Sequence, residues 1–286
     1  MFRFLFQISK YKITYRNWVK VVIFVLLKRN VKGRMRDGTL IPTTFLTIQV
    51  KELMVHGAEP KYDEYEDKIT FYYDGKTVSL KGASKNGDIC GVYLYEEYKY
   101  LEVNGKYVID IGMNIGDSSI YFAIKGAEKV IAFEPFKKVF MIAKDNIDRM
   151  KLSNKIFPVN AGIGSGNSSI RISDLSETTD ISLEEDETGL DIPIYSLDNI
   201  IEQCPSFEIM LKMDCEGCEY QAFKTIKMEN FAKIKRIVME YHHGYESLKS
   251  LLEKNGFKCS VTKPYKSKNR QNYVFNIGYL YAERLK

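Results

Sequence analysis

The segment Val108–Ser119 has the residue types and spacing of a ligand-binding turn. An apolar stretch runs directly into Gly112 and Gly116, and Asp117 and Ser118 then stand as candidate caps at the start of a helix. Glycine lets the backbone approach a flat or charged ligand closely, and the amides at a helix N-terminus face such a ligand. The segment therefore predicts a ligand site at the carboxyl end of the leading strand.

These glycines do not complete either common nucleotide motif. A dinucleotide fingerprint G-x-G-x-x-G that starts at Gly112 requires glycine at two positions that Asn114 and Asp117 occupy here. A second glycine cluster, at 162–166, lacks the lysine that reaches a phosphate in a P-loop, and we expect a turn there. The missing glycines therefore argue against a nicotinamide-dependent oxidoreductase, which stays open as an alternative function.

An acidic residue, Glu134, closes the next apolar stretch, Val130–Phe133, and precedes Pro135. A carboxylate at the end of a second strand offers two oxygens that accept both hydroxyls of a ribose. The position predicts an adenosine-containing ligand without a pyrophosphate clamp. The alternative is a structural charge at a strand end or a helix start.

From residue 106 onward, apolar stretches alternate with helical ones, which predicts βαβ units and a mostly parallel sheet. The predicted strands are Tyr107–Ile111, Lys129–Phe133, Ile156–Val159, Ile209–Met213, Ile237–Glu240 and Tyr273–Tyr281. The predicted helices are Ser118–Lys125, Lys137–Arg149, Tyr220–Ile226 and Tyr245–Asn255. The stretch from Ile172 to Leu211 is acidic and contains no Lys or Arg. Within it, the polar segment 176–189 is interpreted as a solvated loop, or alternatively as a flap over an acceptor site.

The first hundred residues carry a different pattern. Thr43 and Thr44 before an apolar periodic stretch favour a capped helix that ends at Gly57, and Asp74-Gly75 between two short apolar runs favours a β-hairpin. We interpret this part as an accessory element. The predicted division is an N-terminal arm and accessory element at 1–100 and a ligand-binding domain at 101–286.

Four ordered segments carry a resemblance to a known family. They are Asp110–Gly116, Phe133–Pro135, Leu197-Asp198 and Leu211–Glu219. Together they resemble the FkbM family of S-adenosylmethionine-dependent methyltransferases over about half of the chain. The resemblance implies an α/β fold with a Rossmann-like class I sheet of seven strands, the last antiparallel. It also implies S-adenosylmethionine as cofactor and O-methylation of a saccharide, a glycolipid or a related hydroxyl compound as the activity.

The resemblance assigns roles to individual residues. It places the glycine turn beside the methionine portion of the cofactor, Glu134 at the ribose, Asn160 and Ala161 near the adenine, and Asp214 beside the transferable methyl group. The predicted cofactor-binding residues are Asp110, Gly112, Asn114, Gly116, Asp117, Ser118, Glu134, Asn160 and Ala161.

Methyl transfer to a hydroxyl requires in-line alignment and removal of the acceptor proton. The candidate bases are Asp214, Glu216 and His242. Histidine has the best-matched ordinary pKa, near 6.5, whereas Asp214 has the better expected position, and all three stay open. Alternatively, Asp214, Glu216 and Glu240 bind a divalent cation such as magnesium, although we expect no metal.

Cys215 and Cys218 form a C-x-x-C pair inside the segment Leu211–Glu219. A structural zinc ion requires four ligands, and the sequence has no second pair at suitable spacing, so we expect buried and unreactive thiols, with redox sensitivity as the alternative. The five cysteines cannot form a fully paired framework and are typical of a reducing compartment. We predict a cytoplasmic protein.

The positive charge is concentrated at the N-terminus. The first 36 residues contain ten Lys or Arg and no Asp or Glu, whereas the rest has 32 basic and 37 acidic residues. The apolar run Trp18–Leu27 reaches roughly 15 Å as a helix, too short for a bilayer core of about 30 Å. Lys28 and Arg29 replace the small residues of a signal cleavage site, so we expect the arm to be retained.

We favour a helix docked on the protein's own core for this arm, and peripheral contact with a membrane surface is the alternative. We expect no nucleic-acid partner, because no recognised module or base-stacking motif accompanies the basic residues. The expected partner is a small-molecule or glycan acceptor. A membrane-surface binding module with a vestigial nucleotide pocket is the non-enzymatic alternative.

Overall fold

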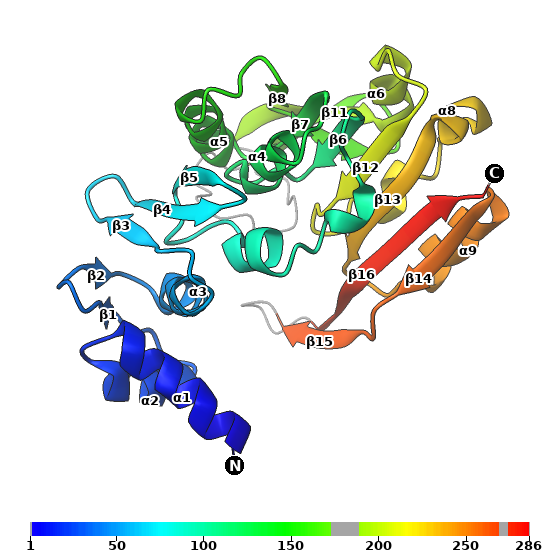
Figure 1. The fold of residues 1–286 in the computed structure, drawn as a ribbon. Coiled ribbons are helices and arrows are strands. Elements are labelled where there is room, and N and C mark those ends of the chain that lie inside the picture. Colours follow the sequence, from blue (N-terminus) through cyan, green and yellow to red (C-terminus); the bar gives the residue numbers. More distant parts are fainter. Residues whose placement is uncertain (1, 173–188, 269–273, 286) are drawn as a thin grey trace. The chain divides into compact units, whose positions relative to one another are not determined.

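The computed structural model describes residues 2–172, 189–268 and 274–285, and Figure 1 shows their arrangement. The chain forms two compact units. Unit 1 comprises Met1–Glu96 together with Asp148–Met150, and unit 2 comprises Glu97–Ile147 and Lys151–Lys286. Each unit is described separately below.

Unit 2 is built on a sheet whose main path has the order β14-β16-β13-β12-β6-β7-β8. The bounds are β6 (Tyr107–Ile111), β7 (Lys129–Phe133), β8 (Ile156–Val159), β12 (Ile209–Met213), β13 (Ile234–Tyr241), β14 (Phe257–Val261) and β16 (Val274–Arg284). Neighbouring strands from β8 to β13 pair in parallel, whereas β16 pairs antiparallel with both β13 and β14. A short strand, β15 (Tyr265–Lys268), also pairs with β16. The predicted seven strands, with the last antiparallel, are confirmed as the main path of the sheet, and β15 adds an eighth strand that was not predicted.

The interior strands are apolar because both faces of a parallel sheet are covered. Every residue of β12 is buried, and four of the five residues of β6 are buried. Two buried charges, Asp110 on β6 and Lys212 on β12, interrupt this pattern as direct register partners. Charges buried this deeply are stable only when they neutralise each other. The pair lies near the carboxyl ends of the strands, where the candidate site is found.

The helices of unit 2 lie beside the strands that they connect (Figure 1). They are α4 (Asp117–Ile124), α5 (Lys137–Arg149), α6 (Leu197–Gln203), α7 (Glu219–Ala222), α8 (Met228–Lys233) and α9 (Glu246–Lys254), and a 3₁₀ turn precedes β6 at Lys99–Leu101. The predicted helix Tyr220–Ile226 is wrong in length, since α7 ends at Ala222. Five residues later the Lys227 amide, just before α8, donates to Asp198, a long-range hydrogen bond that local sequence does not encode.

A second sheet of three strands flanks the main one in unit 2. It has the order β10-β11-β9, with β9 at Gly162–Gly164, β10 at Ser168–Ile172 and β11 at Leu190–Ser196. The predicted turn at 162–166 is therefore partly wrong, because β9 pairs in parallel with β11. A Cβ at Gly164 would lie 2.8 Å from Ile194 Cγ2, so this glycine permits close strand approach. The predicted polar excursion lies outside the described residues except for Gly189.

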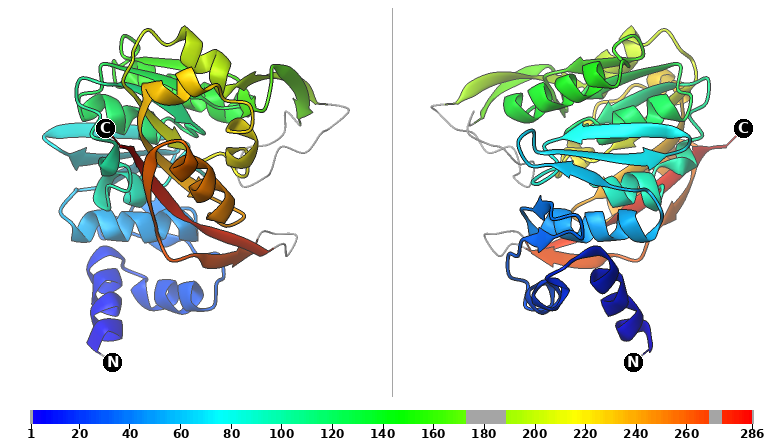
Figure 2. Two further views of the ribbon diagram at one scale, coloured as in Figure 1. Left: turned by 90° about the vertical axis from the view of Figure 1, so that its right-hand side faces the viewer. Right: turned by 60° about the vertical axis from the view of Figure 1, so that its left-hand side comes forward.

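Unit 1 contains three helices and two small antiparallel sheets. The helices are α1 (Phe2–Thr14), α2 (Trp18–Leu26) and α3 (Thr44–Val55), and a π-helical turn spans Cys90–Leu94. The strands are β1 (Gly33–Arg34), β2 (Leu40–Ile41), β3 (Lys61–Asp63), β4 (Lys68–Tyr73) and β5 (Lys76–Lys81). Figure 2 shows β3, β4 and β5 in cyan.

Two local predictions for unit 1 are confirmed. Thr43 caps α3, since its hydroxyl accepts from the Leu46 amide at 3.2 Å. The hairpin β4-β5 turns through Asp74 and Gly75, which have φ angles of +49° and +74° as a primed turn requires. Both features depend on residues close in sequence, which is why the pattern identifies them.

The apolar helix α2 of unit 1 is only partly covered. Val21 is fully buried, whereas Val19, Ile23 and Leu26 keep 51%, 48% and 60% of their surface exposed. In the part of the chain that the structure describes, no helix has both the length and the apolar character that crossing a bilayer requires. An apolar and exposed face thus lies within the basic N-terminal arm.

Candidate active site

A buried ion pair supports the turn after β6. Asp110 Oδ1 lies 3.2 Å from Lys212 Nζ, and the other oxygen of Asp110 accepts from the hydroxyls of Ser118 and Ser119 at 2.7 and 2.6 Å. Burial acts to lower the pKa of Lys212, but Asp110, Asp214 and Asp117 outweigh it, so the pKa is raised. The ammonium therefore stays charged and balances Asp110.

The helix after this turn begins differently from the prediction. The N-cap of α4 is Gly116, with a φ angle of +85° and no side-chain cap, so the prediction of Asp117 and Ser118 as caps is wrong. Both residues lie inside the first turn and are buried. Ser118 faces the sheet, because its hydroxyl bonds to Asp110 and not to the helix amides.

Gly112 has a φ angle of +76°, which favours glycine, and its place is fixed by the protein's own backbone. A Cβ there would lie 1.7 Å from the carbonyl oxygen of Asp214, just after β12. The Lys212 ammonium also donates to the Gly112 carbonyl. The glycine is therefore required by close packing of two strand ends, a reason that differs from the ligand contact inferred from sequence.

Glu134 lies at the end of β7 with only 1% of its surface exposed. Its two oxygens accept from the amides of Asn114 at 3.1 Å and Phe136 at 3.0 Å. Burial raises the pKa of Glu134 to about 8, although those two amides and Lys212 act to lower it. The side chain thus points into the protein and is tied to the turn after β6.

Residues at the end of β8 join the same group. The Asn160 amide donates to the carbonyls of Glu134 and Pro135, both at 2.9 Å, and Ala161 beside it is fully buried. The structure thus brings Asn114, Glu134 and Asn160 together at the carboxyl ends of three neighbouring strands.

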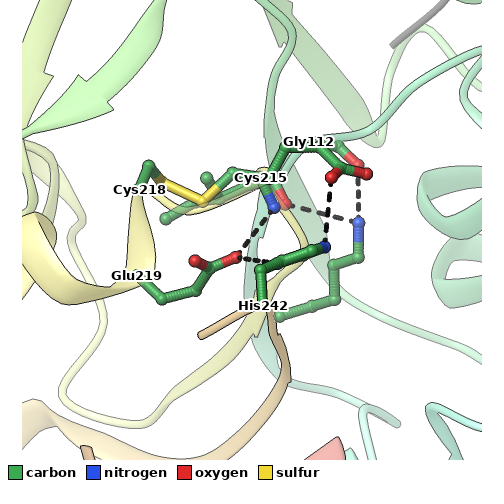
Figure 3. Close-up of a disulfide and its surroundings, with 8 residues drawn as sticks. Gly112, Cys215, Cys218, Glu219 and His242 are labelled. Carbon is green, nitrogen blue, oxygen red and sulfur yellow. Dashed lines mark hydrogen bonds and ion pairs between the residues drawn. A yellow bond between two sulfur atoms is a disulfide. The ribbon is translucent and has the colours of Figure 1, made fainter. Parts of the chain in front are cut away.

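A second group lies at the ends of β12 and β13. Asp214 follows β12, whereas Glu240 and His242 stand two residues apart at the end of β13, and one ligating atom of each lies within 4.8 Å of the others. His242 Nδ1 lies 3.2 Å from Glu219 Oε1 (Figure 3). Its Nε2 lies 3.3 Å from Glu216 Oε2. The three predicted bases are therefore neighbours.

The charges around His242 decide its protonation. Burial acts to lower its pKa, but the hydrogen bond and charge of Glu219, together with Glu216 and Asp214, raise the pKa to about 10. Burial and the charge of Asp214 raise the pKa of Glu240. Because these charges hold the pKa of His242 well above neutral pH, its imidazole is a poor proton acceptor.

Three residues of this region were missed from the sequence. Lys212 and Glu219 are fully buried partners of Asp110 and His242, and the fully buried Tyr98 places its ring 5.5 Å from the Lys212 ammonium. Burial raises the pKa of Tyr98 well above its usual value, and Asp214 adds to the effect. The available signal was Lys212 inside the apolar stretch Ile209–Met213, because a lysine in a buried strand requires an acidic partner.

The prediction that Cys215 and Cys218 are unpaired thiols is wrong, because they form a disulfide (Figure 3). The turn between them, with positive φ angles at Glu216 and Gly217, brings their Cα atoms to 5.5 Å. The Cys215 amide donates to Glu219 Oε1 at 3.2 Å. The disulfide therefore constrains the loop that carries Glu216. It also helps to hold Glu219, the hydrogen-bond partner of His242, in place.

A cavity of about 630 Å³ opens beside this loop. Its walls come from the region of β9 and β10, from β11, and from the loop after β12. The polar side chains of its lining are Ser165, Asn167, Ser168, Ser169, Glu216, Gln221 and His243. Among the described lining residues, Glu216 supplies a carboxyl group and His243 an imidazole, and none is Lys or Arg.

Several known proteins show distant similarity to this chain. An uncharacterised protein of Sulfolobus islandicus rod-shaped virus 1 is 26% identical over 158 residues, which cover 55% of this chain and 73% of that protein. A precorrin-6y C5,15-methyltransferase from Geobacter metallireducens is 12% identical, with a TM-score of 0.41 over 67% of this chain and 86% of that one. Magnesium protoporphyrin IX methyltransferase from Synechocystis, with bound S-adenosylmethionine, is 14% identical, with a TM-score of 0.39 over 67% and 78%.

A family model identifies the chain. The model described as the methyltransferase FkbM domain matches residues 110–259, more than half of the sequence. The match begins at Asp110 of the buried ion pair and includes both groups of site residues. The chain therefore belongs to the FkbM methyltransferase family.

Proposed function

We propose that this methyltransferase uses S-adenosylmethionine and methylates a hydroxyl of a saccharide, a glycolipid or a related metabolite. The observation that carries the proposal is the buried carboxyl of Glu134 beside the turn after β6, in a chain of this family. Each oxygen of Glu134 accepts one backbone amide. Two positions are left for the hydroxyls of a ribose in either protonation state: two acceptors when the group is ionised, or one acceptor and one O–H donor when it is protonated.

The other predicted residues fit the same ligand. The turn carrying Gly112, Asn114 and Gly116 would lie beside the methionine portion, and Asn160 and Ala161 beside the adenine. Asp110 would hold the turn in place through Lys212 and the α4 serines. When bound, S-adenosylmethionine supplies a methyl group already activated by its sulfonium.

The acceptor proposal rests on the polar cavity. Hydroxyl and amide side chains line it, and its only titratable side chains among the described residues are Glu216 and His243. Such a lining favours a neutral polyhydroxylated compound over a phosphorylated one. Asp214 and Glu216 would accept the proton of the acceptor hydroxyl, as general bases within reach of the cavity loop.

Isothermal titration of the full chain with S-adenosylmethionine and S-adenosylhomocysteine tests the cofactor. We expect Glu134→Ala to weaken binding at least tenfold, because it removes both ribose contacts. Glu128→Ala, at an exposed glutamate before β7, is the matched control and should leave affinity unchanged. Absence of binding by the folded protein at millimolar ligand, or competition by NAD, would contradict the proposal.

Transfer of labelled methyl tests the acceptor. Neutral oligosaccharides and glycolipids should be labelled in preference to sugar phosphates of the same size. Preferential labelling of the phosphorylated compounds would contradict the acceptor class while leaving the cofactor proposal intact.

We also propose that the N-terminal arm contacts the anionic, cytoplasmic face of a membrane. On α2, Val19, Ile23 and Leu26 are exposed, and the exposed basic residues Lys20 and Lys28 lie in and beside the same helix. An apolar face flanked by cations binds at the boundary between anionic headgroups and acyl chains. The hydroxyl of a glycolipid would be presented at such a surface.

Sedimentation with phosphatidylcholine vesicles, with and without phosphatidylserine, tests this contact. The triple variant Val19→Ser, Ile23→Ser, Leu26→Ser should lose most vesicle binding, whereas Phe207→Ser, at an exposed aromatic in unit 2, should keep it. Equal sedimentation of the triple variant and the unaltered chain would refute the arm as an anchor.

A further inference from the structure

We propose that Asp214, Glu240 and His242 bind a divalent transition-metal ion, of which Mn²⁺ is the representative, at the carboxyl ends of β12 and β13. The site deepens the proposed function, on which it rests, because it includes Asp214 and adjoins Glu216, the two proposed bases. Its occupancy is nevertheless measurable without S-adenosylmethionine, so the two proposals fail separately.

The sheet brings the three ligands together. Met213 of β12 pairs with Met239 of β13, so Asp214 and Glu240 leave neighbouring strands at the same level. Glu240 and His242 are two residues apart at the end of an extended strand, which directs both side chains to one face. Their ligating atoms lie within 4.8 Å of one another. Ligands on opposite sides of one ion lie roughly 4.2 Å apart at bond lengths of about 2.1 Å, so small side-chain movements suffice.

The second observation is the orientation of the imidazole. Glu219, which is fully buried, accepts at His242 Nδ1, and the Cys215 amide holds the same Glu219 oxygen. Nε2 is thereby directed toward the carboxylates, 3.3 Å from Glu216 and 3.9 Å from Glu240. A histidine that donates one ring nitrogen to a carboxylate and presents the other is the usual arrangement of a metal-ligating histidine.

The charge of the group favours a dication. Asp214, Glu216, Glu240 and Glu219 surround one imidazole, and the nearby Lys212 is engaged by Asp110 and two backbone carbonyls. An ion of charge +2 would relieve the mutual repulsion of these carboxylates.

The donor set indicates the metal class. The magnesium set considered from the sequence uses Glu216 as its third ligand, whereas the structure groups His242 with Asp214 and Glu240. One imidazole nitrogen with two carboxylates suits Mn²⁺, Fe²⁺ or Zn²⁺ better than an all-oxygen set, which suits Mg²⁺ and Ca²⁺. A metal-bound acceptor hydroxyl in this position would lose its proton more easily.

Titration of the chelator-treated full chain with Mn²⁺, followed by the electron paramagnetic resonance of the free ion, tests the site without cofactor. We expect one equivalent to bind with micromolar affinity. Glu240→Gln and His242→Gln should each weaken binding at least tenfold, because each removes a ligand. Glu219→Gln should weaken it about ten- to hundredfold through the orientation of His242.

The matched control is Glu253→Gln, at a half-exposed glutamate on α9 that pairs with Lys249, and it should bind Mn²⁺ as the unaltered chain does. Circular dichroism confirms that each variant is folded, and Glu240→Gln keeps the test valid if His242→Gln does not fold. Absence of binding below millimolar Mn²⁺ would overturn the proposal and leave a protonated His242 bridging the carboxylates. Binding that survives both Glu240→Gln and His242→Gln would overturn it as well.

Discussion

Two charged groups at the same edge of the sheet are balanced in opposite ways. Asp110 has one cation, Lys212, beside one oxygen and two serine hydroxyls on the other, so its charge is matched. His242 instead lies within 4 Å of three carboxyl groups, those of Glu216, Glu219 and Glu240, so the charges around it are not matched. A balanced buried group fixes the backbone, whereas an unbalanced one is costly unless a ligand, a metal ion or a substrate completes it. We therefore expect the Asp110–Lys212 pair to stabilise the fold and the group around His242 to bind a ligand or take part in catalysis.

The largest expected effect is at the balanced pair. Lys212→Met leaves Asp110 buried without its cation and should lower the free energy of unfolding by about 3–5 kcal/mol. Urea denaturation measures it. The double variant Asp110→Asn, Lys212→Met should lose less than Lys212→Met alone, since it removes both charges. A loss below about 1 kcal/mol for Lys212→Met would show that the pair is not structural.

The next effect concerns Glu134, whose pKa is raised to about 8 by burial and is near 4.3 in an unfolded chain. The folded state therefore binds a proton that the unfolded state lacks between these pH values, so stability falls as the pH rises. We expect a loss of about 3 kcal/mol between pH 5 and pH 8 from this group. Glu134→Gln should abolish this slope, whereas Glu128→Gln should keep it. A slope that persists in Glu134→Gln would contradict the assignment.

The disulfide should contribute less. Cys215 and Cys218 are three residues apart, and closing so short a loop stabilises the folded state by about 2 kcal/mol. Replacing both with serine should lower the urea midpoint accordingly, and it should weaken Mn²⁺ binding as well, because the loop supports Glu219. Cys259→Ser, at a free cysteine, is the control. If the Mn²⁺ affinity is unchanged in the double serine variant, the disulfide does not support the metal site.

The smallest effect on stability is expected at the unbalanced group. Glu240→Gln removes a carboxyl group whose pKa is raised by burial and by Asp214, so it should raise the stability of the metal-free protein at neutral pH by about 1 kcal/mol, although it removes a metal ligand. Thermal unfolding in a chelating buffer measures this gain. A loss comparable to that of Lys212→Met would mean that both groups are structural, and the contrast between them would fail.

The sequence by itself determined the sheet and most of its strands. Apolar stretches of strand length between helical stretches are local patterns, and β6, β7, β8 and β12 have the predicted bounds. The turn after β6 and Glu134 at the end of β7 were identified for the same reason, because a strand end is visible in the sequence. The four ordered motifs gave the family.

Tertiary structure alone decided how these residues act on one another. The 1.7 Å approach that requires Gly112, the partnership of Lys212 with Asp110 and the position of Glu219 behind His242 all join segments about 20 to 100 residues apart. The pairing of Cys215 with Cys218 depended on the positive φ angles between them, although the two are close in sequence. Protonation followed from burial and from neighbouring charges, which exist only once the strands have brought these side chains together.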